Sequence, residues 1–235
     1  MSFLSHLHTD LRQARRVRRG ATHAPEDVPQ GLHKSYPRME LTELPPPAAI
    51  QATLSHILNS RISYRDGGDQ SRSNSLDTWG TLLGLALKKR DGSHKRNYPS
   101  GGALYPIETY IIGTIANFAP SVFHYNPGKH ALEKLWELPA DFNIKDLAPS
   151  PQDLLFSSII VFTAVWERSS AKYGDFAYTL ALLEAGHMSE NILLAATALK
   201  LKSRPMAGFD DDALVSLLDL DPPYEQPVHT ITVSF

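Results

Sequence analysis

The hydrophobic pattern of the chain predicts several helices. Apolar residues recur at three- and four-residue spacing in residues 50–61 and again in residues 76–87, which is typical of amphipathic helices. The longest apolar stretch, residues 176–201, predicts a buried helix, and a short helix is expected at residues 211–218. Residues 1–48, in contrast, are rich in proline and basic residues and predict an N-terminal arm and linker.

Strand patterns lie between these helices, in residues 109–115, 121–125, 131–138, 158–166 and 229–235. The turn Asn126-Pro127-Gly128 separates the second strand from the third and predicts a hairpin. The fourth strand is apolar throughout, as a strand covered on both faces requires, so it belongs at the centre of the sheet. Helices and strands interleave without a repeat, which indicates one α+β domain over residues 49–235.

Composition excludes several classes of protein. Hydrophobic residues make up 42% of the chain and charged residues 20%, as in an ordinary folded protein. The formal net charge of -2 argues against nucleic acid as the main partner. Because the chain contains no cysteine, disulfides, thiolate metal sites and cysteine nucleophiles are excluded.

Two segments bear on where the protein works. The five arginines between positions 12 and 19 predict either a solvated arm or a basic tail that binds a partner. The N-terminus lacks the apolar run of a signal peptide, and charged residues interrupt the long apolar helix, which would be costly in lipid. The sequence therefore predicts a cytoplasmic protein with no membrane contact.

The first candidate for chemistry is the segment Arg61-Ile-Ser-Tyr-Arg65, directly after the first predicted helix. In an extended stretch, alternate side chains point to one side, so Arg61, Ser63 and Arg65 can converge on one anion such as a phosphate monoester. Two surface arginines and a loop serine are the alternative interpretation.

The second candidate is a patch of small residues that comprises Pro99, Ser100, Gly101, Gly102 and Ala103. Glycines without Cβ atoms let backbone amides approach a flat heteroaromatic ligand closely. The glycine spacing matches neither a Rossmann fingerprint nor a Walker loop. An ordinary turn before a strand is the alternative interpretation.

The third candidate is the pair Lys172 and Tyr173, which follows the central strand. A lysine beside a phenol lowers the tyrosine pKa through its positive charge, which favours proton transfer. Charged residues at the start of a helix are, however, usually just solvated.

His187 lies between Glu184 and Glu190 at helical spacings that place all three near one face. Such a trio suggests a metal site, but no second helix carries a Glu-x-x-His pair, and a histidine of this kind is more often a packing residue. We therefore expect no metal.

Taken in order, these segments resemble the SagB-type dehydrogenases, also called azoline oxidases, of the FMN-dependent nitroreductase superfamily. The resemblance covers residues 34–235, and its most specific blocks are Pro-Ser-Gly-Gly-Ala-Leu-Tyr-Pro and Glu-Ala-Gly-His. The matching motifs are Lys34-Ser-Tyr-Pro37, Leu44-Pro-Pro, Arg61-x-Ser-x-Arg65, Pro99-Ser-Gly-Gly-Ala-Leu-Tyr-Pro-Ile-Glu108, Val122-Phe-His-Tyr-Asn-Pro127, Lys172-Tyr-Gly174, Leu183-Glu-Ala-Gly-His187 and Ala207-Gly-Phe-Asp210.

The resemblance implies a nitroreductase-like α+β fold, with a central antiparallel sheet flanked by helices, built as an intertwined homodimer with FMN at the dimer interface. The FMN phosphate would be held by Arg61, Ser63 and Arg65. The small-residue segment 99–103 of one subunit would line the flavin ring bound to the other subunit. Ala207 and Gly208 would lie near the ring on its opposite side.

The resemblance also implies an activity. Lys172 and Tyr173 match a catalytic pair that removes a ring proton while hydride passes to the flavin, which converts a thiazoline or oxazoline into a thiazole or oxazole. The substrate would be an azoline-containing peptide or carrier-bound intermediate, and partner proteins of a biosynthetic complex are expected. Two alternatives stay open: an NAD(P)H-dependent nitro or quinone reductase, and a non-catalytic flavin-binding scaffold subunit.

Overall fold

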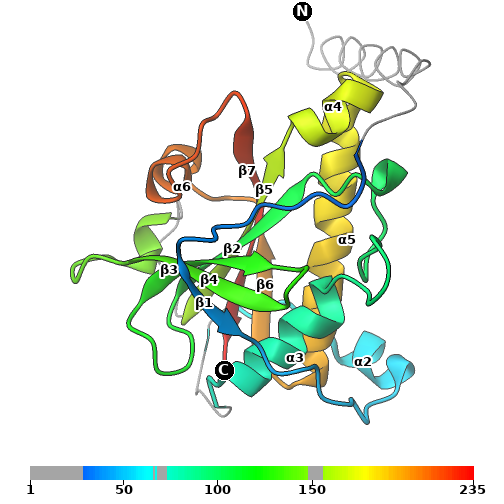
Figure 1. Cartoon of the computed structure of the whole chain (residues 1–235). Helices are drawn as coiled ribbons and strands as arrows, with labels where there is room; N and C mark the ends of the chain where they lie inside the picture. Colours follow the sequence, from blue (N-terminus) through cyan, green and yellow to red (C-terminus); the bar gives the residue numbers. More distant parts are fainter. Residues whose placement is uncertain (1–28, 66, 68–72, 148–155) are drawn as a thin grey trace, which may run out of the picture.

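The computed structural model describes residues 29–65, 67, 73–147 and 156–235 (Figure 1). The arginine-rich segment at positions 12–19 lies outside these residues. Within them, seven strands form one sheet in the order β1-β4-β3-β2-β5-β7-β6, and every neighbouring pair is antiparallel. The strands are β1 (Glu40–Glu43), β2 (Ile107–Gly113), β3 (Ser121–Asn126), β4 (Ala131–Glu137), β5 (Ser158–Val165), β6 (Lys202–Met206) and β7 (Glu225–Ser234). The expected antiparallel sheet is confirmed, and the expected homodimer stays a prediction.

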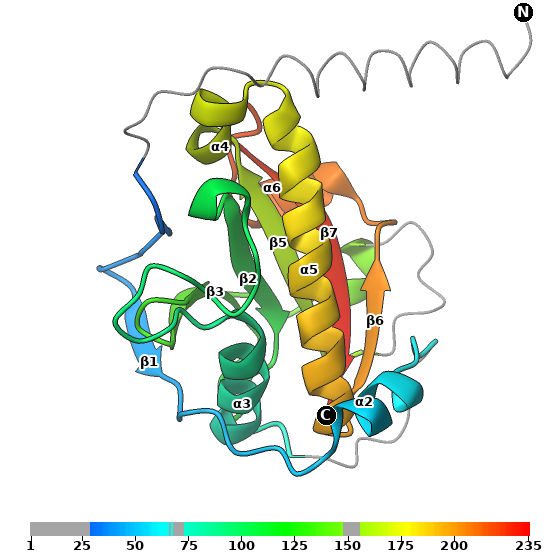
Figure 2. The ribbon, with the colours of Figure 1, turned by 90° about the vertical axis from the view of Figure 1, so that its right-hand side faces the viewer.

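The helices pack mainly on one face of the sheet. They are α2 (Leu54–Ser60), α3 (Leu76–Leu87), α4 (Glu167–Tyr173), α5 (Phe176–Ala198) and α6 (Asp211–Leu217), with the 3-10 turns η1 (Gly101–Ala103) and η2 (Ile144–Leu147). The long helix α5 runs along the sheet, with α4 at its N-terminal end and α2 at its C-terminal end (Figure 2). Among the helices described, none is long and apolar enough to cross a membrane.

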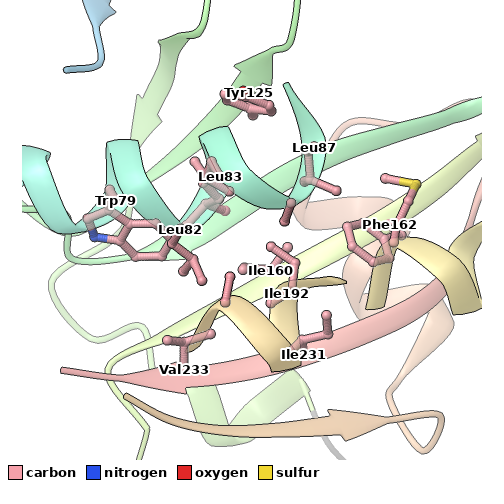
Figure 3. Packing of buried hydrophobic residues seen from close by; sticks show 14 of the residues in the cluster. Trp79, Leu82, Leu83, Leu87, Tyr125, Ile160, Phe162, Ile192, Ile231 and Val233 are labelled. Atoms are coloured by element: carbon pink, nitrogen blue, oxygen red, sulfur yellow. The ribbon is translucent and has the colours of Figure 1, made fainter. Parts of the chain in front are cut away.

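Apolar residues cover both faces of β5. Ile160 belongs to the cluster that packs against α3 and α5 (Figure 3), whereas its neighbour Val161 belongs to the cluster with Leu214 of α6. Because successive side chains of a strand point to opposite faces, an uninterrupted apolar run is what this position requires. The prediction of a central strand covered on both faces is confirmed.

The predicted helices and the hairpin are confirmed, with small shifts at their ends. The helix expected at residues 76–87 has these bounds, because Ser75 caps its start by accepting a hydrogen bond from Thr78 N at 3.2 Å. The hairpin of β3 and β4 forms as expected. The sequence did not predict β1, β6 or α4, which are short and lack a clear apolar period.

Two expectations change in the structure. The segment assigned to the arm contributes β1, which pairs with β4, and Leu44 beyond it is only 6% exposed. The boundary expected at residue 48 stays a prediction, but the sheet includes residues before it. The expectation that α5 is buried is wrong for one side of the helix: Tyr178 is 56% and Leu183 is 54% exposed, because the sheet covers the helix from one side only.

Candidate functional site

The small-residue segment forms a tight turn with a left-handed residue at its centre. Ser100 O accepts a hydrogen bond from Ala103 N at 3.1 Å, and Ser100 Oγ accepts one from Tyr105 N at 2.9 Å. Gly102 has φ +63°, a conformation that strains any residue with a Cβ atom. We call residues 99–103 the cradle.

The cradle lies directly against Lys172 and Tyr173. A Cβ atom at Gly102 would stand 2.7 Å from Tyr173 Oη and 3.4 Å from Lys172 Nζ. Both side chains are half-buried at the end of α4, with Lys172 Nζ 5.7 Å from the centre of the Tyr173 ring. Two candidate segments some seventy residues apart in the sequence therefore meet in one place.

A buried arginine contacts the residues that flank the cradle in the sequence. Arg96, only 4% exposed, donates from Nη1 to Tyr98 Oη at 2.7 Å and from Nη2 to Leu32 O at 2.8 Å. Its guanidinium lies 4.6 Å from the ring centre of Tyr105. Burial raises the pKa of Tyr98 to well above its usual value, so this phenol is neutral and accepts the hydrogen bond from the arginine. These contacts hold Tyr98 and Tyr105, which lie on either side of the cradle in the sequence.

Glu184 of α5 is a second buried group behind the cradle. It is 2% exposed, and among the residues that the structure describes its Oε1 atom has no hydrogen-bond partner. Burial raises the pKa of Glu184 to about 7, although Ser100 and Arg96 oppose the shift. The helical spacing had suggested a metal trio, but His187 and Glu190 are exposed, and only Glu184 turns into the protein.

The segment expected to bind phosphate, residues 61–65, lies away from the cradle. Arg61 is half-buried at the end of α2, and Ser63 and Arg65 are exposed. Tyr64 N donates a hydrogen bond to Ser203 O at 3.1 Å, which places the segment beside β6. We call Arg61, Ser63 and Arg65 the anchor.

Ala207 and Gly208 are exposed after the end of β6. The next residue, Phe209, lines a cavity of about 420 Å³ together with Tyr178 and Leu182 of α5. Leu180, between these two positions, faces Gly101 of the cradle instead. Side chains two residues apart on a helix point to nearly opposite sides, so α5 separates the cradle from the loop at Ala207.

The structure therefore brings together the cradle with the pair at 172–173, but it keeps the anchor apart from both. The anchor follows α2, which packs near Ala198 of α5, whereas the cradle contacts Leu180. Eighteen residues of helix separate these two positions, which is about 27 Å at 1.5 Å per residue. Figure 2 shows α2, which precedes the anchor, at the C-terminal end of α5, and α4, which carries Lys172 and Tyr173, at its N-terminal end.

These features define an α+β protein of nitroreductase-like fold. The model of the nitroreductase family matches residues 52–234, and the chain belongs to this family. Members of the family typically bind FMN. The resemblance expected from the sequence motifs is thereby confirmed.

Two relatives are named as processing proteins. The microcin B17-processing protein McbC of Escherichia coli is 33% identical over 155 residues, which are 63% of this chain and 57% of McbC. The trifolitoxin-processing protein TfxB of Rhizobium leguminosarum bv. trifolii is 29% identical over 229 residues, covering 88% of this chain and 60% of TfxB. The chain thus spans less than two thirds of the length of either relative.

Solved structures show the same fold. The Escherichia coli microcin synthetase McbBCD complex with truncated pro-MccB17 bound contains a chain that matches with a TM-score of 0.65 at 29% identity, over 80% of this chain and 74% of that chain. A nitroreductase-like structure from Ralstonia eutropha matches with a TM-score of 0.70 at 20% identity, over 90% of this chain and 96% of that chain.

Proposed function

We propose that the protein is an FMN-dependent oxidoreductase that oxidises azoline rings to azoles in a peptide or carrier-bound intermediate. One observation carries the proposal: the glycine turn of the cradle lies within contact distance of Tyr173 Oη and Lys172 Nζ. A flat ligand on the cradle would therefore lie beside a phenol and an amine. The relatives named as processing proteins support a modified peptide as the substrate.

The residues present fit FMN. The anchor offers two guanidinium groups and a hydroxyl for a phosphate, which arginine binds through paired hydrogen bonds. The cradle offers backbone without side chains at Gly101 and Gly102, and Ala207 with Gly208 offers a second segment of small residues. When bound, FMN would supply the acceptor for the hydride that the azoline ring loses.

We further propose that the working form is a homodimer in which each FMN site combines two chains. Leu180 at the cradle and Ala198 beside α2 lie about 27 Å apart along α5, so we infer that the anchor and the cradle of one chain do not hold the same flavin. The exposed apolar residues Tyr178, Leu182 and Leu183 lie along the same helix. Pairing two chains along α5 would cover these residues and bring the anchor of one chain to the cradle of the other.

Lys172 and Tyr173 would act on the proton of the azoline ring. Aromatisation removes one proton and one hydride, so a base must stand beside the carbon that loses the proton. Tyr173 Oη would accept this proton, and the positive charge of Lys172 would stabilise the phenolate that takes it up. The cradle would hold the ring system in place and exclude water from one side.

The first test is an absorbance spectrum of the purified protein after incubation with FMN, followed by turnover of a synthetic thiazoline peptide. We expect stoichiometric FMN in the wild type, and retained FMN with a loss of azoline oxidation of at least 100-fold in Tyr173→Phe and Lys172→Ala. Full oxidation by both variants would disprove the role of the pair. No binding in excess FMN would instead leave a scaffold subunit as the function.

The family match also supports a second candidate, an NAD(P)H-dependent nitro or quinone reductase. In that case NAD(P)H would bleach the flavin rapidly, and a nitroaromatic compound would restore its colour with turnover. The azoline oxidase should show neither reaction at a comparable rate. Partner proteins of a biosynthetic complex are part of the proposal, since the McbBCD structure holds a similar chain in an assembly.

A further inference from the structure

Four charged side chains form a buried chain that crosses three strands and ends on α4. His124 of β3 lies between two carboxylates, with Nδ1 2.8 Å from Glu133 Oε2 and Nε2 3.0 Å from Glu108 Oε2. Glu108 of β2 then forms an ion pair with Arg168 in the first turn of α4. The side chains of the first three residues are at most 1% exposed, and that of Arg168 is 9% exposed.

The charges of this chain balance. Both ring nitrogens of His124 face carboxylates, so both must carry protons for both hydrogen bonds to form. Burial alone would lower the pKa of His124, but the two carboxylates raise it above its usual value. In this spatial order, Glu133, His124, Glu108 and Arg168 alternate in charge from negative to positive, and their net charge is zero.

Such a chain is a poor way to gain stability. Removing ions from water costs more than a buried pair usually returns, and apolar residues of similar size often serve as well. Glu108 nevertheless has three partners, because Lys34 N also donates to Oε1 at 2.5 Å. A fully satisfied buried charge network fixes a specific geometry.

That geometry includes the position of Lys172 and Tyr173. Arg168 binds Glu108 with one end of its guanidinium and donates from Nη1 to Tyr105 O at 3.1 Å with the other. Tyr105 and Glu108 follow the cradle on the same segment, and Lys172 follows Arg168 by one helical turn. The helix α4 is therefore tied to this segment at Arg168 and meets it again where Tyr173 reaches Gly102.

We propose that Glu108 and Arg168 are positioning residues. They set the position of α4 along its axis and its rotation about that axis, and so hold Lys172 and Tyr173 at the cradle. The inference rests on the proposed function for the role of the pair, but the positions themselves are testable without a substrate. A displacement of about 1 Å at a reacting group is enough to lower a rate roughly 100-fold.

Two variants separate positioning from stability. Arg168→Met leaves the two buried carboxylates with only His124 to balance their charge and should lower the melting temperature. The double variant Glu108→Gln with Arg168→Met removes both charges, so its melting temperature should return toward the wild type. We expect kcat to stay about 10- to 100-fold low in both variants, with KM changed less than about threefold. Recovery of wild-type kcat in the double variant would overturn the proposal.

A second readout does not depend on azoline oxidation. With 3-fluorotyrosine placed at position 173, the 19F resonance should shift or broaden in Arg168→Met and in the double variant. Glu225→Gln is the matched control, because Glu225 is also a buried carboxylate of the sheet, 4% exposed, and bonds Lys34 and Thr163 instead of α4. The control should keep the wild-type resonance. Unchanged resonances in the Arg168 variants would overturn the positioning role, whereas an inactive wild type with shifted resonances would overturn only the proposed function.

Discussion

The cradle and the anchor differ in how firmly the protein holds them. The cradle is tied to the interior by Arg96, Glu184 and the Glu108–Arg168 pair, all of which are largely buried. The anchor follows α2, in which no residue is buried, and one backbone hydrogen bond joins it to β6. A preformed surface loses little entropy when a flat ring binds, whereas the half-buried Arg61 and the exposed Arg65 keep part of their hydration until a phosphate replaces it. We therefore expect the cradle to orient the flavin ring and the anchor to supply most of the affinity for FMN.

The largest effect should come from removing the anchor charges. Arg61→Ala with Arg65→Ala should raise the Kd for FMN by roughly two to four orders of magnitude, because each charge-assisted hydrogen bond contributes about 1.5–3 kcal/mol. Fluorescence titration measures the Kd. Riboflavin, which has no phosphate, serves as the control ligand and should bind both proteins equally. An equal loss for riboflavin would show that the variant damages the fold instead of the phosphate contacts.

The free energy of unfolding should depend on pH through Glu184, a buried carboxyl behind the cradle that has no equivalent in the anchor. The pKa of Glu184 is about 7 against a usual value of 4.5, so between these pH values the folded protein holds a proton that the unfolded chain has lost. The stabilisation from this group is complete below pH 4.5 and is lost as pH rises through 7, by about 3 kcal/mol in all. Urea unfolding should show this loss in the wild type and not in Glu184→Gln. If the free energies of unfolding of the wild type and Glu184→Gln changed with pH in the same way, the raised pKa of Glu184 would be contradicted.

Two glycines allow the contact at the cradle to be measured separately from backbone strain. Gly92 and Gly102 have φ +67° and +63°, but a Cβ atom at Gly92 would meet no atom of the described residues within 4 Å. Alanine should cost about 1–2 kcal/mol at either position because of the left-handed backbone. Gly102→Ala should cost about 1–2 kcal/mol more, since Tyr173 must move. Equal free energies of unfolding for the two variants would mean that the Tyr173 hydroxyl moves aside without a cost in free energy.

The smallest effects concern the N-terminal caps of two helices, the exposed α2 and the buried α3. Thr53 caps α2 and Ser75 caps α3, each by accepting a backbone hydrogen bond. Ser75→Ala should lower the global free energy of unfolding by about 1 kcal/mol, because α3 is buried in the core. Thr53→Ala should increase hydrogen exchange in α2 alone and leave global unfolding within about 0.5 kcal/mol, as for a surface substitution. A global loss from Thr53→Ala would show that α2 is more firmly packed than its exposure indicates.

The sequence predicted the long elements well and the short ones poorly. The helix at residues 76–87 and the strand at 158–166 carry enough apolar positions to define a period or a continuous run. The strands β1 and β6 are only four and five residues long, and the helix α4 is polar, so tertiary contacts define them instead of local pattern.

The sequence also identified candidate segments that meet, but not what supports them. Nothing in the spacing of Gly102 and Tyr173 reveals their contact, because it depends on how α4 packs against the turn. The buried series of charges was missed altogether, although one signal was available: Glu108, His124 and Glu133 stand beside apolar residues within the predicted strands. Charged residues at such positions must find partners inside the protein. Which partners they find depends on strand order, which the sequence does not state.

The separation of the anchor from the cradle along α5 has a consequence for mixtures of defective chains. A chain that lacks Arg61 and Arg65 and a chain that lacks the Tyr173 hydroxyl would each be inactive alone in the proposed homodimer. When the two are combined in one dimer, one composite site receives both lesions and the other receives neither. Co-expression of the two inactive proteins should therefore restore activity by complementation, with about half of the randomly paired dimers carrying a single intact site.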